Sequence, residues 1–255
     1  MQILQITDPH LYGNAGAQLR GVETDSSLRN VLERAFAHDV DYSAILVTGD
    51  LVQDDPSGYL RFKSILCGLQ TPVLCIPGNH DEPAAMRRSL EQEPFQYCGT
   101  RTIGAWQFIM LDSYESGHVG GRLAAAELGR LDACLAKCAA HTLVCLHHHP
   151  VRMGSRWLDG VGLGNAEEFW RVIDRHGHVR AVAWGHVHQA YDGERNGVRL
   201  MGTPSTCAQF LPHSDRYALD SRPPAYRRLE LRDDGRIDTQ VHWVERASLR
   251  PASAG

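Results

Sequence analysis

The sequence predicts an α/β protein whose last third is antiparallel, on the border between the α/β and α+β classes. In the first two-thirds, short apolar runs alternate with segments of helical periodicity. After Gly185, apolar runs flank the turn sequences GERNG and RDDGR, a pattern typical of β-hairpins. A polar cluster follows five of the predicted strands, which is where α/β proteins place their functional sites.

Each predicted strand is a short apolar run followed by Gly, Pro, Asp, Asn or His. In order, these strands are Gln2–Thr7, Ser43–Thr48, Val73–Ile76, Trp106–Leu111, Thr142–Leu146 and Val179–Trp184. The helical patterns cover Ser26–His38, Ser57–Leu69, Leu123–Ala139 and Ala166–Arg175. Asp25 is expected to cap the first helix, and Pro56 with Ser57 to open the second. The hairpins pair Gln189–Asp192 with Val198–Gly202, and Tyr226–Leu231 with Ile237–Val244.

Length and composition limit the classes of protein. A chain of 255 residues suits one large domain, expected over residues 1–246, with residues 247–255 as a flexible tail. Thirty acidic against 26 basic residues give a net charge of −4, which disfavours a nucleic-acid partner. There is no signal-like start and no apolar run of membrane-spanning length, so no membrane is expected. Seven cysteines without a CxxC pair predict reduced thiols and a cytoplasmic location.

The chain has an unusually high number of histidines, 14, and their positions matter more than their count. The five clusters at strand ends are Asp8-Pro9-His10, Gly49-Asp50, Gly78-Asn79-His80-Asp81, His147-His148-His149 and Gly185-His186-Val187-His188. Each alone is also typical of a turn, but five in this order predict one shared site. On an extended chain His186 and His188 would point the same way, so that both could face that site.

Seven of these side chains suit two metal ions that share a carboxylate. They are Asp8, His10, Asp50, Asn79, His147, His186 and His188. Seven ligands are too many for one tetrahedral ion, and imidazoles with carboxylates suit Zn, Fe or Mn better than Mg or Ca. The two carboxylates, two divalent cations and a bridging hydroxide together have a positive net charge, which one phosphodiester neutralises. The set therefore predicts phosphoester hydrolysis.

The same clusters resemble the five sequence blocks of calcineurin-like metallophosphoesterases. Within that superfamily the chain most resembles the bacterial class III 3′,5′-cyclic AMP phosphodiesterases. The resemblance runs to about Val244 through ILQITDPHL, VTGDLVQD, PGNHD, LHHHP, Trp157–Asp159 and GTPSTCAQFLPH at 202–213. The PSTCAQF segment points to the cyclic nucleotide branch. The resemblance implies a four-layer αββα sandwich with a dinuclear metal site at the C-terminal edge of the strands.

The resemblance also implies which residues hold each metal. The first would be bound by Asp8, His10, Asp50 and His188, and the second by Asp50, Asn79, His147 and His186, with Asp50 bridging. Among the three consecutive histidines His147 matches the first His of the family block, and His148 is the second choice. Iron or manganese is favoured, with zinc as the alternative.

His80 is expected to be catalytic without binding metal. It would donate to a non-bridging phosphate oxygen or to the departing O3′. Related protein phosphatases orient this histidine with an Asp that corresponds to Gln53, so the dyad is expected to be absent. The expected substrate contacts are His10, Asp50, Asn79, His80 and His188. Ser205, Thr206 and Gln209 are candidates for the nucleotide rim or, equally, for a structural loop.

The predicted function is hydrolysis of 3′,5′-cyclic AMP to 5′-AMP by attack of a metal-bridging hydroxide. The alternative is a broader small-molecule phosphodiesterase, of the glycerophosphodiester type, on the same metal site. A nuclease is disfavoured by the net charge and by the lack of a basic stripe, and Arg87-Arg88 and Arg227-Arg228 are interpreted as solvated faces. A non-catalytic scaffold would be expected to have lost ligands, and every ligand position is filled.

Overall fold

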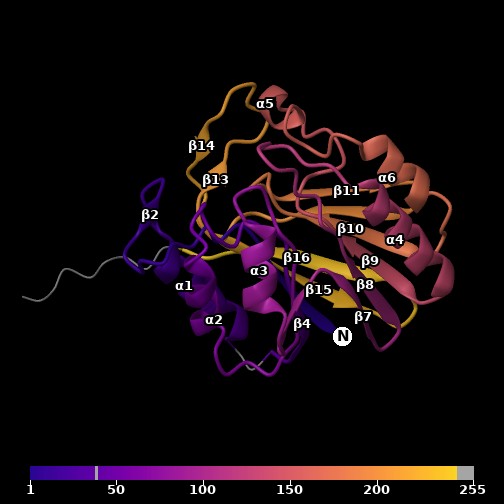
Figure 1. Cartoon of the computed structure of the whole chain (residues 1–255), viewed down its shortest axis with the longest axis horizontal. Coiled ribbons are helices and arrows are strands. Elements are labelled where there is room, and N and C mark those ends of the chain that lie inside the picture. The colour runs from indigo at the N-terminus through magenta and orange to yellow at the C-terminus, as the bar shows by residue number, and fades with distance from the viewer. Residues whose placement is uncertain (38–39, 246–255) are drawn as a thin grey trace, which may run out of the picture.

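Two six-stranded sheets form the centre of the molecule (Figure 1). The computed structural model describes residues 1–37 and 40–245, so the predicted tail at 247–255 lies outside it. The first sheet has the order β16-β15-β1-β4-β5-β6, and β1, β4, β5 and β6 run parallel. Its strands are β1 (Gln2–Ile6), β4 (Tyr42–Val47), β5 (Val73–Cys75), β6 (Phe95–Tyr97), β15 (Ala225–Leu231) and β16 (Ile237–Trp243).

The second sheet has the order β11-β12-β10-β9-β8-β7, with a parallel centre and antiparallel edges. Its strands are β7 (Gly99–Ile103), β8 (Trp106–Met110), β9 (His141–Cys145), β10 (Val179–Trp184), β11 (Tyr191–Arg195) and β12 (Val198–Gly202). Two short ribbons, β2 (Gln18–Leu19) with β3 (Val22–Glu23) and β13 (Gln209–Phe210) with β14 (Leu219–Asp220), complete the strands. Both predicted hairpins are confirmed, as β11–β12 and β15–β16.

Side chains of the central strands alternate between the two faces of the sheet, which explains why the sheets form layers. Leu143 and Cys145 of β9 belong to the core shared with the first sheet, whereas Val144 and Leu146 belong to the core on the opposite face. Because successive side chains of a strand point to opposite faces, a strand that is apolar at every position is covered on both. The predicted αββα sandwich is confirmed.

Helices form the two outer layers. Near the first sheet lie α1 (Thr24–Phe36), α2 (Gly58–Ile65) and α3 (Pro83–Leu90), and near the second lie α4 (Ala125–Lys137) and α6 (Ala166–Ile173) (Figure 1). The sequence pattern missed the one-turn α5 (Arg156–Asp159), which is too short to show a periodicity, and α3, whose only large apolar residues are Met86 and Leu90. The predicted cap is wrong: Glu23 precedes α1, and Asp25 lies in its first turn, where it binds Arg29 and Arg61.

A buried arginine joins the two sheets. Arg227 of β15 is 1% exposed, so its interpretation as part of a solvated face is wrong. Its guanidinium donates to the Asp192 carboxylate at 2.9 and 3.1 Å and to the Gly202 carbonyl at 2.9 Å, both on the second sheet. A buried arginine is tolerated when its donors are paired, so Arg227 fixes one sheet relative to the other.

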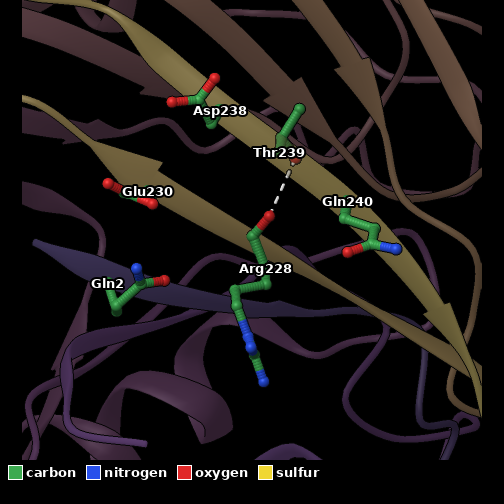
Figure 2. A pocket seen from close by; sticks show the side chains of 6 residues that line it. All are labelled: Gln2, Arg228, Glu230, Asp238, Thr239 and Gln240. Atoms are coloured by element: carbon green, nitrogen blue, oxygen red, sulfur yellow. Dashed lines mark hydrogen bonds between the residues drawn. The ribbon is translucent and has the colours of Figure 1, made fainter.

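A hollow of about 310 Å³ lies on the surface of β1, β15 and β16 (Figure 2). It is lined by Gln2, Arg228, Glu230, Asp238, Thr239 and Gln240, and the Thr239 hydroxyl donates to the Arg228 carbonyl at 3.0 Å. Its lining has both signs of charge and contains none of the predicted metal ligands, so this hollow is separate from the predicted site. None of the helices in the described residues has the length and apolarity needed to cross a membrane.

Candidate metal centre

The five polar clusters meet where the two sheets lie against each other. The ends of β1, β4 and β5 bring Asp8, His10, Asp50 and Asn79, and the ends of β9 and β10 bring His147, His186 and His188. All of these side chains except that of Asn79 belong to groups whose candidate ligand atoms lie within 4.8 Å of one another. Asn79 Oδ1 is 3.3 Å from His147 Nε2. The structure thus brings all seven predicted ligands together.

One half of the site gathers around Asp8. His188 Nε2 is 3.1 Å from Asp8 Oδ1 and 3.2 Å from His10 Nε2. His10 Nε2 is in turn 3.9 Å from Asp50 Oδ2. These four side chains are the set expected for the first metal.

The other half gathers around His147. Its Nε2 is 3.2 Å from His186 Nδ1, 3.3 Å from Asn79 Oδ1 and 3.4 Å from Asp50 Oδ2. The same Asp50 oxygen therefore lies near both halves, as a bridging ligand requires.

Backbone acceptors determine which ring nitrogens remain for a cation. His147 Nδ1 is 2.7 Å from the Thr48 carbonyl, and His188 Nδ1 is 2.6 Å from the Ala208 carbonyl. A carbonyl can only accept, so each Nδ1 carries hydrogen, and in the neutral ring Nε2 presents a lone pair to the cluster. Metal-binding histidines are commonly oriented by such an acceptor. The donor set therefore fits two transition-metal ions.

The pKa shifts agree with a ligand role. Burial lowers the pKa of His10 to about 3 and holds the pKa of His186 well below its usual range, so both imidazoles stay neutral. Burial alone would lower the pKa of His147, but the Asp50 and Asp8 carboxylates outweigh it and raise that pKa to about 9. For Asp50, burial alone would raise the pKa, but His147 and His10 outweigh it and the pKa falls well below 3.8. A cation at Asp50 would replace the proton of His147.

Five of the seven predicted ligands have left-handed backbone conformations. Their φ angles lie between 48° and 64°, at Asp8, His10, Asp50, His186 and His188. Such conformations are uncommon outside glycine and concentrate at functional sites. The expected extended conformation of His186 and His188 is therefore wrong. The two imidazoles turn to different halves of the site, His186 to His147 and His188 to Asp8.

Two glycines allow the ligand loops to approach closely. A Cβ at Gly185 would lie 2.1 Å from Thr7 Oγ1 and 2.7 Å from Asp8 Oδ2. A Cβ at Gly78 would lie 2.2 Å from Asp50 Oδ1. Any larger residue would displace a ligand carboxylate, so these clusters need glycine for space.

Asp81 holds two ligand loops together, a role that the sequence reasoning missed. Its buried carboxylate accepts the Leu51 N–H at 3.1 Å and the Gly78 N–H at 2.9 Å. It also accepts the Tyr59 hydroxyl at 3.0 Å. The loop with Asp50 is thereby fixed against the loop with Asn79.

His148 has a different environment from His147. Its Nδ1 is 2.8 Å from the Ser113 hydroxyl and its Nε2 is 3.2 Å from the Val119 carbonyl. Both ring nitrogens are thus satisfied by protein groups, which favours His147 over the second choice as a ligand. His149 stacks on His186 with ring centroids 5.7 Å apart.

His80 has a carboxylate partner after all. Its Nδ1 is 3.1 Å from both oxygens of Asp54, the residue after Gln53, and the Gln53 amide donates to Asp54 Oδ2 at 2.7 Å. The expected absence of an Asp–His pair is therefore wrong. The left-handed conformation of Asp54 (φ 53°) is part of the turn that carries its side chain to His80.

A cavity of about 120 Å³ opens over the predicted metal ligands. All five expected substrate contacts line it, together with His186. The rest of its wall is Arg20, Val119, Trp157, Leu158, Val161, Phe210 and Tyr217. Sequence reasoning by polar type missed this wall, although Phe210 lies inside the GTPSTCAQFLPH segment.

The polar residues of the PSTCAQF segment belong to a structural loop. Ser205, Thr206 and Gln209 are at most 1% exposed, and none of them lines the cavity. The Ser205 hydroxyl donates to the Asp8 carbonyl at 2.7 Å, and Gln209 bonds back to Ser205. Of the two alternatives that the sequence left open, the structure therefore favours the structural loop, which supports the ligand loops from behind.

Comparison with known proteins agrees with this geometry. Residues 1–190 match the family model of the calcineurin-like phosphoesterases. The chain is 39% identical to the 3′,5′-cyclic adenosine monophosphate phosphodiesterase CpdA of Haemophilus influenzae, over 98% of this chain and 93% of that protein. It is 39% identical to CpdA of Escherichia coli K12, over 100% of this chain and 94% of that protein. It is 37% identical to CpdA of Pseudomonas aeruginosa, over 95% of this chain and 90% of that protein.

Solved structures share the fold at low identity. A dimetal phosphatase from Danio rerio superimposes with a TM-score of 0.62 at 13% identity, covering 96% of this chain and 98% of that one. GAP50, described as the anchor in the inner membrane complex of Plasmodium, superimposes with a TM-score of 0.66 at 12% identity, covering 98% of this chain and 87% of that one. With its ligand clusters, its αββα layers and these matches, the chain belongs to the calcineurin-like phosphoesterase family.

Proposed function

We propose that the protein hydrolyses 3′,5′-cyclic AMP to 5′-AMP in a metal-dependent reaction. The observation that carries the proposal is the pair of ligand groups that share Asp50 beneath a cavity with an aromatic wall. Relatives that are 37–39% identical over almost the whole chain are named cyclic AMP phosphodiesterases, which supports this substrate.

The chain would bind two divalent cations through the ligand sets inferred above. Asp8, His10, Asp50 and His188 would hold one, and Asp50, Asn79, His147 and His186 the other. When bound, the cations supply an activated water and positive charge for the phosphodiester. Imidazole with carboxylate ligands suits iron, manganese or zinc better than magnesium or calcium, and of these we propose iron or manganese, with zinc as the alternative.

The remaining residues would bind and orient the substrate. His10, Asp50, Asn79, His80 and His188 line the cavity and would surround the cyclic phosphate. In the reaction water adds to phosphorus, the bond from phosphorus to O3′ breaks, and O3′ takes a proton. When both ring nitrogens of His80 carry hydrogen, Nδ1–H donates to Asp54 and Nε2–H is left to donate to a phosphate oxygen or to O3′.

A broader phosphodiesterase activity is the second candidate, because metal ligands recognise the phosphate and not the base. Metal-free protein loaded with Fe, Mn, Zn or Mg should be tested on cyclic AMP, glycerophosphodiesters and an artificial aryl diester. We expect Fe or Mn to restore hydrolysis, with cyclic AMP as the best substrate. Far faster turnover of glycerophosphodiesters would favour the second candidate, and no rescue by any metal would refute the mechanism.

The proposed setting is the cytoplasm, with a small cyclic nucleotide as the partner and neither nucleic acid nor membrane. The state of the cysteines supports the cytoplasmic location. No disulfide joins the cysteines of the described residues, and thiols stay reduced in the cytosol.

A further inference from the structure

We propose that Arg20, Trp157, Phe210 and Tyr217 form a nucleobase subsite beside the metal centre. The inference rests on the proposed function, because it identifies the part of a cyclic nucleotide that the metal ligands cannot recognise. All four residues line the cavity that holds the metal ligands. Phe210 and Tyr217 lie beyond residues 1–190, the part matched by the general family model.

Three aromatic rings form one wall of this subsite. Trp157, Phe210 and Tyr217 contact one another edge to face, with ring centroids 5.1 to 5.4 Å apart. They come from α5, from β13 and from the loop before β14, which lie side by side in Figure 1. Every base has a π-face that stacks on aromatic rings, so such a wall suits a nucleobase.

The wall is connected directly to the metal site. The Phe210 ring stacks on the imidazole of His188, with centroids 4.1 Å apart and an interplanar angle of 12°. A ligand whose phosphate lies at the metals would therefore have its base next to these rings. Across the cavity mouth Val119 is 57% exposed and Tyr217 is 47% exposed, and a base would cover this apolar rim.

Arg20 is held over the same rings. Its guanidinium carbon is 5.2 Å from the centroid of Phe210 and 5.1 Å from that of Tyr217, and its Nε donates to the Tyr217 hydroxyl. These contacts leave both terminal nitrogens without a protein partner among the described residues. Arginine has donors and no acceptor, so these groups suit the ring nitrogens and carbonyls of a base.

The backbone at Arg20 indicates that its position is specific. Arg20 and Gly21 form the two-residue turn between β2 and β3, with φ angles of 50° and 75°. Both central residues of this turn type need positive φ, which favours Asn, Asp or Gly at the first position. An arginine there has an unfavourable backbone conformation, a feature that concentrates at ligand sites. Trp157 adds a buried indole N–H without a partner among the described residues.

The test compares two substrates that share the reacting atoms. One is cyclic AMP, and the other is 1-deoxyribose 3′,5′-cyclic phosphate, which lacks the base. The variants are Arg20→Ala, Arg20→Lys and Trp157→Ala. Arg222→Ala is the matched control, because Arg222 packs 4.9 Å over Trp243 and does not line the cavity.

We expect the wild-type kcat/KM to be at least about tenfold higher for cyclic AMP than for the abasic substrate. Each alanine variant should lower the ratio of these two kcat/KM values about tenfold, by raising KM for cyclic AMP. Arg20→Lys should lower it nearly as far, because an ammonium lacks the planar group that stacks on rings. Arg222→Ala should leave both rates unchanged. Equal wild-type rates on the two substrates would overturn the proposal, and so would variants that lower both rates alike.

A binding measurement separates this proposal from the proposed activity. We expect metal-loaded protein to bind 5′-AMP at least about tenfold more tightly than ribose 5-phosphate, and Arg20→Ala and Trp157→Ala to remove the difference. If this holds while cyclic AMP is not hydrolysed, the subsite stands and the proposed reaction fails. Equal affinity for the two ligands would overturn the subsite even if cyclic AMP is turned over.

Discussion

The Asp54 carboxylate lies 3.1 Å from Nδ1 of His80 through both of its oxygens. Asp54 follows Gln53, whose amide donates to the same carboxylate. His80 itself is fixed from its backbone, because its N–H donates to Asp50 Oδ1 at 2.8 Å. One loop therefore orients the histidine at the cavity from two sides.

Loss of Asp54 is expected to impair His80 without removing metal. Asp54→Asn should lower kcat for cyclic AMP about tenfold with little change in KM, because an orienting partner acts through the group it positions. His80→Ala should lower kcat about 100-fold or more. In a double-mutant cycle, Asp54→Asn should have almost no further effect in the His80→Ala background. Fully additive effects would contradict the positioning role.

His147 and His148 are expected to differ in metal binding. His147→Ala should lower bound metal from two ions to about one, measured by elemental analysis, because its Nε2 faces Asp50 and Asn79. His148→Ala should keep both ions, although it removes the side-chain partner of the Ser113 hydroxyl and of the Val119 carbonyl and lowers stability by about 1–3 kcal/mol. The reverse pattern of metal loss would show that the assignment is off by one residue.

Gly185→Ala should weaken the metal site through a steric contact. The added Cβ would lie 2.1 Å from Thr7 Oγ1, which donates to Asp8 Oδ2. We expect at least about tenfold lower metal affinity, since orienting groups of a ligand contribute that much. Gly177→Ala is the matched control, because a Cβ there meets nothing within 4 Å. Equal affinities in the two variants would argue against the close approach.

Arg227→Met should destabilise the pairing of the two sheets. Removing the guanidinium leaves the Gly202 carbonyl buried without that donor and the half-exposed Asp192 with only its 3.9 Å contact to Arg199. We expect a loss of about 2–3 kcal/mol in the free energy of unfolding, measured with urea. The neighbouring Arg228→Met, at a half-buried position, should lose less than about 1 kcal/mol. A similar loss in both variants would contradict the proposed role of Arg227.

Acid should remove stability that depends on Asp25. Burial alone would raise the pKa of this carboxyl, but hydrogen bonds from Arg29 and Arg61 outweigh it and hold the pKa below 3.8. A pKa that is lower in the folded state adds stability above the unfolded value and loses it as pH falls through the folded value. The free energy of unfolding should therefore fall more steeply below about pH 4 in wild type than in Asp25→Asn. Parallel curves would exclude this contribution.

Local sequence patterns predicted most of the long elements and the proposed ligand set. Runs of apolar residues predicted the strands that carry the site, because hydrophobic periodicity is a local property. The polar residues after those strands predicted the seven side chains that the structure brings together, since strand ends share an edge. The one-turn α5 was missed because four residues show no periodicity, and α3 was missed because it has few large apolar residues.

Only the tertiary structure decided how these parts meet. The site lies between two sheets, with Asp50 from one and His147 from the other 3.4 Å apart, and the pairing of sheets depends on long-range packing. The left-handed backbone at His186 and His188, and at Asp54 beside His80, is imposed by surrounding contacts against local preference. Arg20 and Tyr217 meet across 197 positions of sequence, a distance over which no local pattern carries information.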